Sequence, residues 1–288
     1  MTTTAPLLIL GTNPRAAALA ATLTAAGRTT VSFGPEQLPR LARQFGLEDT
    51  RLILLCEESP EAAEAALAAL PAPLARRDLV NLTSGTGAQA ERAAARATAR
   101  GANYLQGALM AHPEHVGDPA TVLVYGGSGE VFARNEAELR LLGDATYLGP
   151  AVGVVPLYDL ALLNLAWATL VGFLQTAALL GTAGVTARSV VPLLTRWLGT
   201  TVADVIGGYA AQVDEGHFPG DGEWLELDAP LMEHLREATE AHGLDAGLPL
   251  LVQSLTARGV AAGHGRASFA SLIEVIRAPV TTHPPKPP

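Results

Sequence analysis

The sequence contains one cysteine and few charged residues. Because Cys56 is the only cysteine among 288 residues, an internal disulfide framework is excluded and a reducing, cytoplasmic location is expected. Cys56 ends the strand-like run LILLC, so we interpret it as a core residue rather than a nucleophile. Charged residues make up 16% of the chain, the formal net charge is −9, and no basic stripe is evident. Nucleic acid is therefore not expected as a partner.

Several common catalytic and phosphate-binding motifs are also missing. The chain has neither a G-x-S-x-G nucleophile elbow nor a Walker loop. The segment HPEH (His112–His115) places two imidazoles around a carboxylate, but its spacing is not a standard zinc pattern and no third ligand is evident. We predict a polar loop here and no metal site.

The most prominent feature that is present is an apolar segment from Val154 to Gly184. As a helix it would be apolar on every face and buried nearly all round. About 25 helical residues span about 38 Å, which suggests a link between two lobes or two subunits. The length also permits a membrane-spanning interpretation. Asp159, Asn164 and Gln175 interrupt the run, however, and no Lys/Arg cluster flanks it, so we favour a buried helix and expect no membrane.

Two expectations follow from this apolar segment. One small bundle cannot cover all of its faces, so we predict an obligate homodimer. Asp159 lies near its start among leucines. Burying a lone carboxylate is unfavourable, so Asp159 is expected to have a partner, to face a cleft, or to take part in chemistry.

The pattern of secondary structure divides the chain near residue 150. Up to Gly149, short apolar runs alternate with Ala-rich helical stretches, which predicts an α/β fold with a mostly parallel sheet covered on both faces. After that point only helical patterns occur. We therefore predict an α/β domain over 1–150, an all-α region over 151–280, and a flexible tail over 281–288.

The turn after the first predicted strand stands where a dinucleotide site has G-x-G-x-x-G. Its six residues are Gly11, Thr12, Asn13, Pro14, Arg15 and Ala16. The first glycine is present and Ala16 replaces the third, but Asn13 replaces the second. Asn13 followed by Pro14 is also a good helix start, and Arg15 supplies a compensating charge. A structural turn and a working dinucleotide site both remain open.

Several longer motifs point to one family. They include VNLTSGT (Val80–Thr86), YLQGALMAHPEHVGDP (Tyr104–Pro119), LVYGGSGEVF (Leu123–Phe132), YDLALL (Tyr158–Leu163), GFLQTAALLGTAGV (Gly172–Val185), DEGHFPGD (Asp214–Asp221) and AAGHGRASFASLIEVIR (Ala261–Arg277). They cover most of the chain in a fixed order. In these motifs the sequence resembles the imine reductase and reductive aminase family, part of the wider 6-phosphogluconate and β-hydroxyacid dehydrogenase group.

The resemblance implies a fold, a cofactor and a reaction. The expected fold is an N-terminal Rossmann-like domain, a long interdomain helix and a C-terminal all-α bundle, exchanged between the two subunits of a dimer. The expected function is NADPH-dependent reduction of the C=N bond of a small imine or iminium, with a cyclic substrate favoured; some members make the imine from a ketone and an amine. The implied site comprises Asp159 as proton donor or iminium partner, a substrate pocket of Trp167, Leu163 and Met110, and cofactor contacts from Gly11, Thr12, Asn13, Arg15 and Ser84.

The departures from the family pattern lie at the cofactor site. The family has G-L-G-x-M-G at the first turn and a basic clamp after the second strand, whereas this chain has GTNPRA and FGPE (Phe33–Glu36). One hypothesis is that NADPH binds weakly through other contacts. The alternative is a protein that has lost NADPH binding and acts as a non-redox acid/base catalyst, such as an isomerase or cyclase, or as a binding protein.

Overall fold

A computed structural model describes residues 6–34, 50–71 and 73–278 of the chain. The chain divides into two compact units, 1–167 (unit 1) and 168–288 (unit 2), which we describe separately. This division falls inside the long helix rather than at residue 150. The predicted flexible tail over 281–288 and the residues after the second strand, 35–49, lie outside the described residues.

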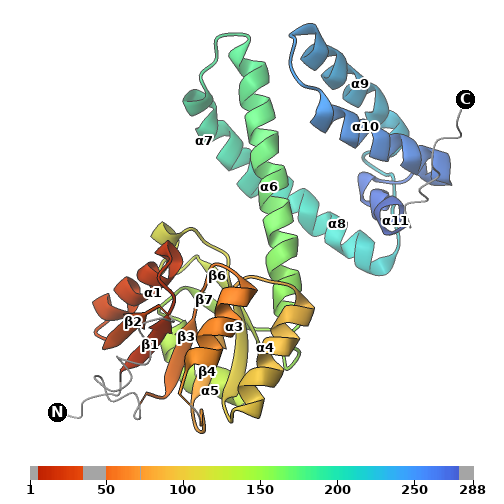
Figure 1. Cartoon of the computed structure of the whole chain (residues 1–288). Coiled ribbons are helices and arrows are strands. Elements are labelled where there is room, and N and C mark those ends of the chain that lie inside the picture. Colours follow the sequence, from red (N-terminus) through yellow and green to blue (C-terminus); the bar gives the residue numbers. More distant parts are fainter. Residues whose placement is uncertain (1–5, 35–49, 72, 279–288) are drawn as a thin grey trace, which may run out of the picture. The chain divides into compact units, whose positions relative to one another are not determined.

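Unit 1 is built on a seven-stranded sheet with the order β2-β1-β3-β4-β5-β6-β7 (Figure 1). The strands are β1 (Leu7–Leu10), β2 (Thr30–Phe33), β3 (Leu52–Leu55), β4 (Asp78–Asn81), β5 (Asn103–Leu109), β6 (Val122–Gly127) and β7 (Asp144–Tyr147). All neighbours pair in parallel except β5 and β6, which are antiparallel. The central strands β1 and β3 are uninterrupted apolar runs, because both faces of a parallel sheet are covered.

In the described part of unit 1, four helices cover the two faces of this sheet. They are α1 (Pro14–Ala25), α3 (Pro60–Ala69), α4 (Gly87–Ala99) and α5 (Gly129–Leu139). One apolar cluster joins the sheet to α1 and α5, and a second cluster joins the opposite face to α3 and α4. Each helix begins after a residue whose side chain accepts a hydrogen bond from the first turn; these residues are Asn13, Ser59, Thr86 and Ser128. The predicted α/β class and the Rossmann-like order of elements are confirmed.

Unit 2 is helical throughout its described part. The long helix α6 (Val154–Gly181) begins in unit 1 and continues into unit 2. The other helices are α7 (Ala187–Trp197), α8 (Ala203–Glu215), α9 (Leu225–Ala241), α10 (Gly247–Gly259) and α11 (Leu272–Arg277), with π-helical turns over Leu198–Val202 and Val260–His264 and a 3-10 turn over Phe269–Ser271. A small core of Leu225, Leu272 and Val275 joins α9 to α11.

The apolar surface of α6 is largely exposed in the single chain. By length and composition α6 could cross a membrane, with a mean hydropathy of 1.6 over an 18-residue window, and 17% of that window is buried. The expectation of a helix buried nearly all round is therefore wrong for one chain taken alone. The physical reason is that the helices of the same chain leave side chains such as Leu170 and Leu174 uncovered.

Candidate functional site

The candidate site lies at the carboxyl edge of the sheet, between β1 and β3. Strand β1 pairs with β2 on one side and with β3 on the other. The chain therefore moves in one direction across the sheet from β1 to β2, and in the opposite direction from β2 to β3. Ligands of open α/β sheets bind in the crevice at such a switch point, beyond the carboxyl ends of the strands. Here that position is occupied by the turn after β1 and by the residues that follow β3.

The turn after β1 is held tightly against the end of β3. Gly11 has a φ of +139°, and a Cβ atom built there would lie 2.0 Å from the carbonyl oxygen of Cys56, so only glycine fits. The amide of Asn13 donates to that same carbonyl oxygen at 2.7 Å, while its Oδ1 accepts from the N–H of Ala16 at 3.0 Å. The predicted helix cap at Asn13 is thus confirmed, and Asn13 also ties the turn to β3.

The backbone of this turn nevertheless fits an anionic ligand. The N–H groups of Thr12, Asn13 and Arg15 make no hydrogen bond within the described residues, while that of Ala16 is taken by Asn13 and Pro14 has none. Thr12 is exposed and Arg15 is half-buried. Three free amides and a guanidinium at the start of a helix suit a diphosphate group. The residues therefore fit the phosphates of a dinucleotide, with one amide fewer than an uncapped turn would offer.

The two residues that follow β3, Cys56 and Glu57, add an inert thiol and a carboxyl group. Glu57 is 6% exposed, and its enclosed Oε1 has no hydrogen-bond partner among the described residues. Burial and, secondarily, the neighbouring Glu58 raise the pKa of the Glu57 carboxyl. Burial raises the pKa of the Cys56 thiol to about 11, although Arg15 opposes the shift. A buried neutral thiol is no nucleophile, which confirms Cys56 as a core residue.

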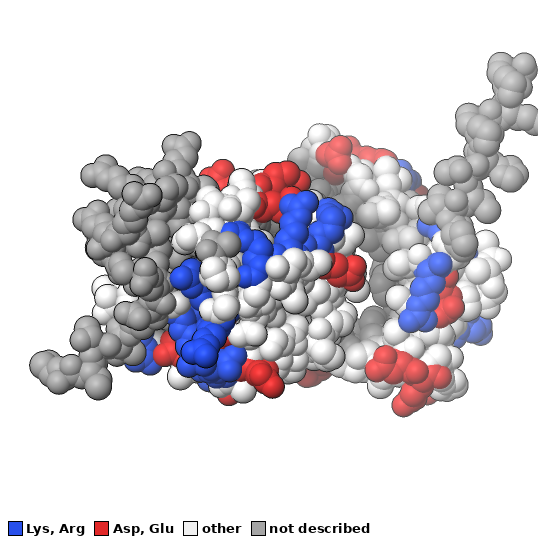
Figure 2. Space-filling view, turned by 60° about the horizontal axis from the view of Figure 1, so that its bottom comes forward, with Lys and Arg blue, Asp and Glu red and all other residues white. Residues whose placement is uncertain are grey.

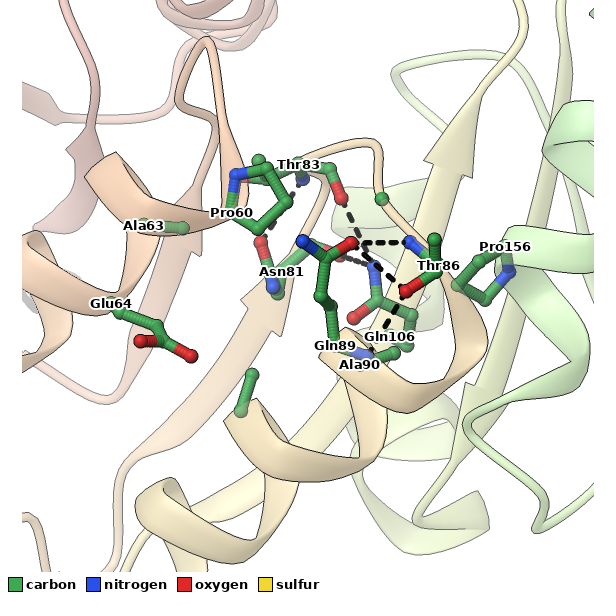
Figure 3. A pocket seen from close by; sticks show the side chains of 12 residues that line it. Pro60, Ala63, Glu64, Asn81, Thr83, Thr86, Gln89, Ala90, Gln106 and Pro156 are labelled. Carbon is green, nitrogen blue, oxygen red and sulfur yellow. Dashed lines mark hydrogen bonds between the residues drawn. The ribbon is translucent and has the colours of Figure 1, made fainter.

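A buried hydrogen-bond network supports the loop that follows β4 (Figure 3). The Tyr104 hydroxyl accepts from the Asn81 amide at 3.1 Å and donates to Gln106 Oε1 at 2.6 Å. The Gln106 amide in turn donates to the carbonyl oxygens of Asn81 and Thr83. Burial raises the pKa of the Tyr104 hydroxyl, so it remains a donor. The network fixes the loop that carries Ser84, which is half-buried.

This loop also borders a small cavity, shown in Figure 3. Glu64 of α3, Gln89 of α4 and Pro156 of α6 contribute to its walls. Its volume of about 20 Å³ accommodates a water molecule but not a substrate. Thr86 and Gln89 close a reciprocal cap at the start of α4, which keeps the loop in place.

The start of α6 brings Asp159 and Met110 to the same region of unit 1. Met110 follows β5 and packs against Ala108 and Val124, in a cluster that includes Val155 of α6. Asp159 lies one turn beyond Val155 and is 3% exposed. Its carboxylate forms no hydrogen bond or ion pair within the described residues. Its oxygens are not fully enclosed by the protein either. Its oxygens therefore remain available to a ligand.

The remaining predicted pocket residues lie further along α6. Leu163 is half-buried, and Trp167, two helical turns beyond Asp159, is 63% exposed. Unit 1 alone therefore forms no wall over Trp167. The HPEH segment is an exposed loop with a 3-10 turn over Pro113–His115, as predicted. Within the described ranges, no group of three or more metal-ligating side chains is found.

Sequence reasoning missed two parts of this site. Glu57 could have been found, because it directly follows the third apolar run and such positions reach the crevice of an α/β sheet. The network of Asn81, Tyr104 and Gln106 gives no signal, because its members look like ordinary strand residues until the pairing of β4 with β5 is known.

Comparisons with known proteins agree with this geometry. Residues 151–278 match the family model described as NADPH-dependent reductive aminase-like, C-terminal domain. An NADPH-dependent reductive aminase of Aspergillus oryzae is 34% identical over 258 residues, 87% of each chain. A reductive aminase from Aspergillus terreus, solved with NADPH and ethyl levulinate, is 33% identical with a TM-score of 0.85, over 96% of this chain and 100% of that one. The Streptomyces aurantiacus imine reductase is 25% identical with a TM-score of 0.81, over 95% and 100%.

Proposed function

Because this chain belongs to the imine reductase and reductive aminase family, we propose that it reduces the C=N bond of a small imine or iminium with NADPH. The relatives named for that chemistry are similar to this chain over nearly their whole length. The observation that carries the proposal is Asp159, a buried carboxylate with no protein partner within the described residues. The comparisons support the redox hypothesis and none supports the cofactor-free alternative.

The cofactor would be held at the carboxyl edge of the unit 1 sheet. The free amides of Thr12, Asn13 and Arg15 would bind its diphosphate, and the loop with Ser84 would contact its nicotinamide end. When bound, NADPH supplies the hydride. Because Asn13 occupies the Ala16 amide and Glu57 places a carboxyl beside the turn, we expect a lower affinity than an uncapped, uncharged site would have.

Asp159 would act on the nitrogen of the substrate. Reduction adds a hydride to the carbon and a proton to the nitrogen of the C=N bond. A carboxylate pairs with an iminium nitrogen, and a carboxylic acid donates a proton to an imine nitrogen, so Asp159 suits either form. Leu163 and Trp167 continue along α6 from Asp159 and provide apolar contact for the substrate, with Met110 on the unit 1 side.

The test is kinetic and uses a cyclic imine with NADPH. We expect Asp159→Ala and Asp159→Asn to lower turnover by about 10²–10⁴-fold, because a positioned proton donor acts mainly in the transition state. The dissociation constant for NADPH, measured by calorimetry, should stay within about threefold of wild type, because a proton donor acts on turnover rather than on cofactor binding. Unchanged turnover would remove Asp159 from the mechanism. Loss in the alanine variant alone would show that the polar group, rather than its ionisation, matters.

The active form is proposed to be a homodimer. Unit 2 exposes Leu174, Leu193 and Trp197, and α6 and α7 together form an apolar cavity of about 440 Å³. Exposed apolar surface of this extent is unusual for a monomer. A second copy would cover it and would also supply the wall over Trp167 that unit 1 lacks. Light scattering across a dilution series tests this, and a folded monomer at micromolar concentration would overturn it.

A further inference from the structure

A second cavity lies at the opposite edge of the unit 1 sheet, where the parallel strands begin. Its lining comprises Thr50, Arg51, Ala75, Arg76, Arg77, Asn103 and Arg134. Its volume of about 680 Å³ is typical of small-molecule sites, which span about 300–1,000 Å³. Figure 2 shows basic side chains gathered on this side of unit 1. We call it the arginine cavity; it is separated from the candidate active site by the length of the strands.

Among the described residues that line the arginine cavity, the arginines carry the charge and no acidic side chain is present. Asp78, fully buried, accepts two hydrogen bonds from Arg134, at 2.8 and 3.0 Å, and one each from Asn135 and Asn103. Burial alone would raise the pKa of the Asp78 carboxyl, but these bonds together hold it below its usual range. Asp78 therefore neutralises Arg134. Arg51 and Arg76 form no ion pair within the described ranges, although the chain as a whole carries a net charge of −9.

The backbone at Arg76 is also unfavourable. Arg76 has a φ of +65°, the one positive φ at a non-glycine position in the described part of the chain. It is the third residue of a turn closed by the Arg77 N–H donating to the Leu74 carbonyl at 3.1 Å, where glycine is favoured. The Arg76 side chain is exposed, so packing does not compensate. A charged side chain at a position that favours glycine is the second observation that points to this cavity.

We propose that the arginine cavity binds a small molecule that carries two or more phosphate groups. One guanidinium group can bind two oxygens of a phosphate at once. Several guanidinium groups around one cavity therefore favour a ligand with more than one phosphate. Among the described residues, no aromatic side chain lines the cavity, so they offer a nucleobase no stacking partner. The phosphates themselves therefore carry the binding. The inference is independent of the proposed reductase function, because the cavity lies at the other edge of the sheet.

The first experiment is calorimetry on the full chain with pyrophosphate, inorganic triphosphate and ATP. We expect all three to bind, with ATP within about threefold of inorganic triphosphate, because base–aromatic stacking is absent. Binding should weaken as ionic strength rises. Saturating NADPH should leave pyrophosphate binding unchanged. Displacement of pyrophosphate by NADPH would place the anion at the cofactor turn and overturn the proposal. Binding of nucleic acid without binding of pyrophosphate would also overturn it, in favour of a macromolecular surface.

Variants separate the backbone strain of Arg76 from its charge. We expect Arg76→Gly to raise the melting temperature of the unliganded protein, because glycine adopts this φ without strain. The same variant should bind pyrophosphate about tenfold more weakly, since one charge-assisted contact is lost. Arg51→Ala should weaken pyrophosphate binding to a similar degree. Arg92→Ala, on an exposed face of α4 outside the cavity, is the matched control and should bind as wild type does. Wild-type affinity in both Arg76→Gly and Arg51→Ala would refute the proposal.

Discussion

The two units differ in how far they bury their apolar side chains. Unit 1 buries its strands in two large clusters, one on each face of the sheet. Unit 2 has a small core of three residues. Among the described residues, every large apolar side chain exposed by more than about a third lies at or after Val154, except Val122. The part of unit 1 before α6 thus covers nearly all of its own apolar side chains, whereas α6 and the helices that follow it carry an apolar surface that something else must cover.

This difference indicates which part of the chain forms an interface. A sheet covered by its own helices satisfies its apolar residues within one chain. Helices α6, α7 and α8 leave side chains such as Leu174, Leu193 and Ile206 exposed. Their pattern is the one expected of an obligate interface, which resembles a domain core cut in half.

A charge placed on the exposed surface of unit 2 should disrupt the dimer. Leu174 is 63% exposed in the single chain. If a second copy covers it, Leu174→Glu buries an unpaired carboxylate at the interface and raises the dimer dissociation constant by about 100-fold or more. The control is Val122→Glu, at an apolar residue of unit 1 that is 45% exposed and has no proposed partner. Sedimentation or light scattering that finds the two variants equally dimeric would end the contrast.

Core truncation should affect the two units separately. Leu54 is 1% exposed at the centre of β3, so Leu54→Ala should lower the free energy of unfolding of unit 1 by about 2–5 kcal/mol. Native-state hydrogen exchange would report this as lost protection in β1, β3 and β4, with α7 and α8 retaining theirs. An equal loss of protection in both units would show that they unfold as one cooperative body.

Acid should weaken unit 1 through the buried Asp78–Arg134 pair. The folded-state pKa of Asp78 lies below its unfolded value of about 3.9, so its stabilisation is present above that pH and is lost as pH falls through the folded-state pKa. We expect Asp78→Asn to lower unfolding stability by about 1.5–3 kcal/mol at neutral pH and to flatten the acid limb. Glu233→Gln removes an exposed partner of Arg236 on α9 and serves as the control with little effect. Parallel pH profiles for wild type and Asp78→Asn would contradict this.

Much of the fold could be predicted from local pattern. The runs PLLIL and RLILLC identified β1 and β3 because a buried parallel strand reads as an uninterrupted apolar run. Asn13 followed by Pro14 identified the start of α1 because that pairing supplies a cap and a fixed φ. The exposure of α6 could not be predicted, since the same side chains suit a helix covered by its own chain and one covered by a second copy.

The sites depended more on long-range pairing. Asp159 could be singled out from the sequence because a lone acid among leucines is unusual. The arginine cavity could not, because Arg51, Arg76 and Arg134 come from three segments far apart in the chain. Their convergence follows from the parallel pairing of β3 with β4 and the position of α5. The overall net charge of −9 gives no sign that these arginines lie together.

The smallest expected effect concerns the cap at the cofactor turn. Asn13→Gly releases the Ala16 amide for a phosphate and keeps the positive end of α1 available, so NADPH affinity should rise by about three- to tenfold. The unliganded variant should lose about 1 kcal/mol of stability, because the bond to the Cys56 carbonyl is lost.

Ser128→Gly is the matched control, because it removes the cap of α5. Since β6 runs antiparallel to β5, that cap lies at the opposite edge of the sheet. It should lower stability to a similar degree without changing NADPH affinity. Calorimetry with NADPH on wild type and both variants decides the matter. An unchanged dissociation constant in Asn13→Gly would show that the cap does not limit cofactor binding, and Glu57 would become the next residue to test, by Glu57→Gln.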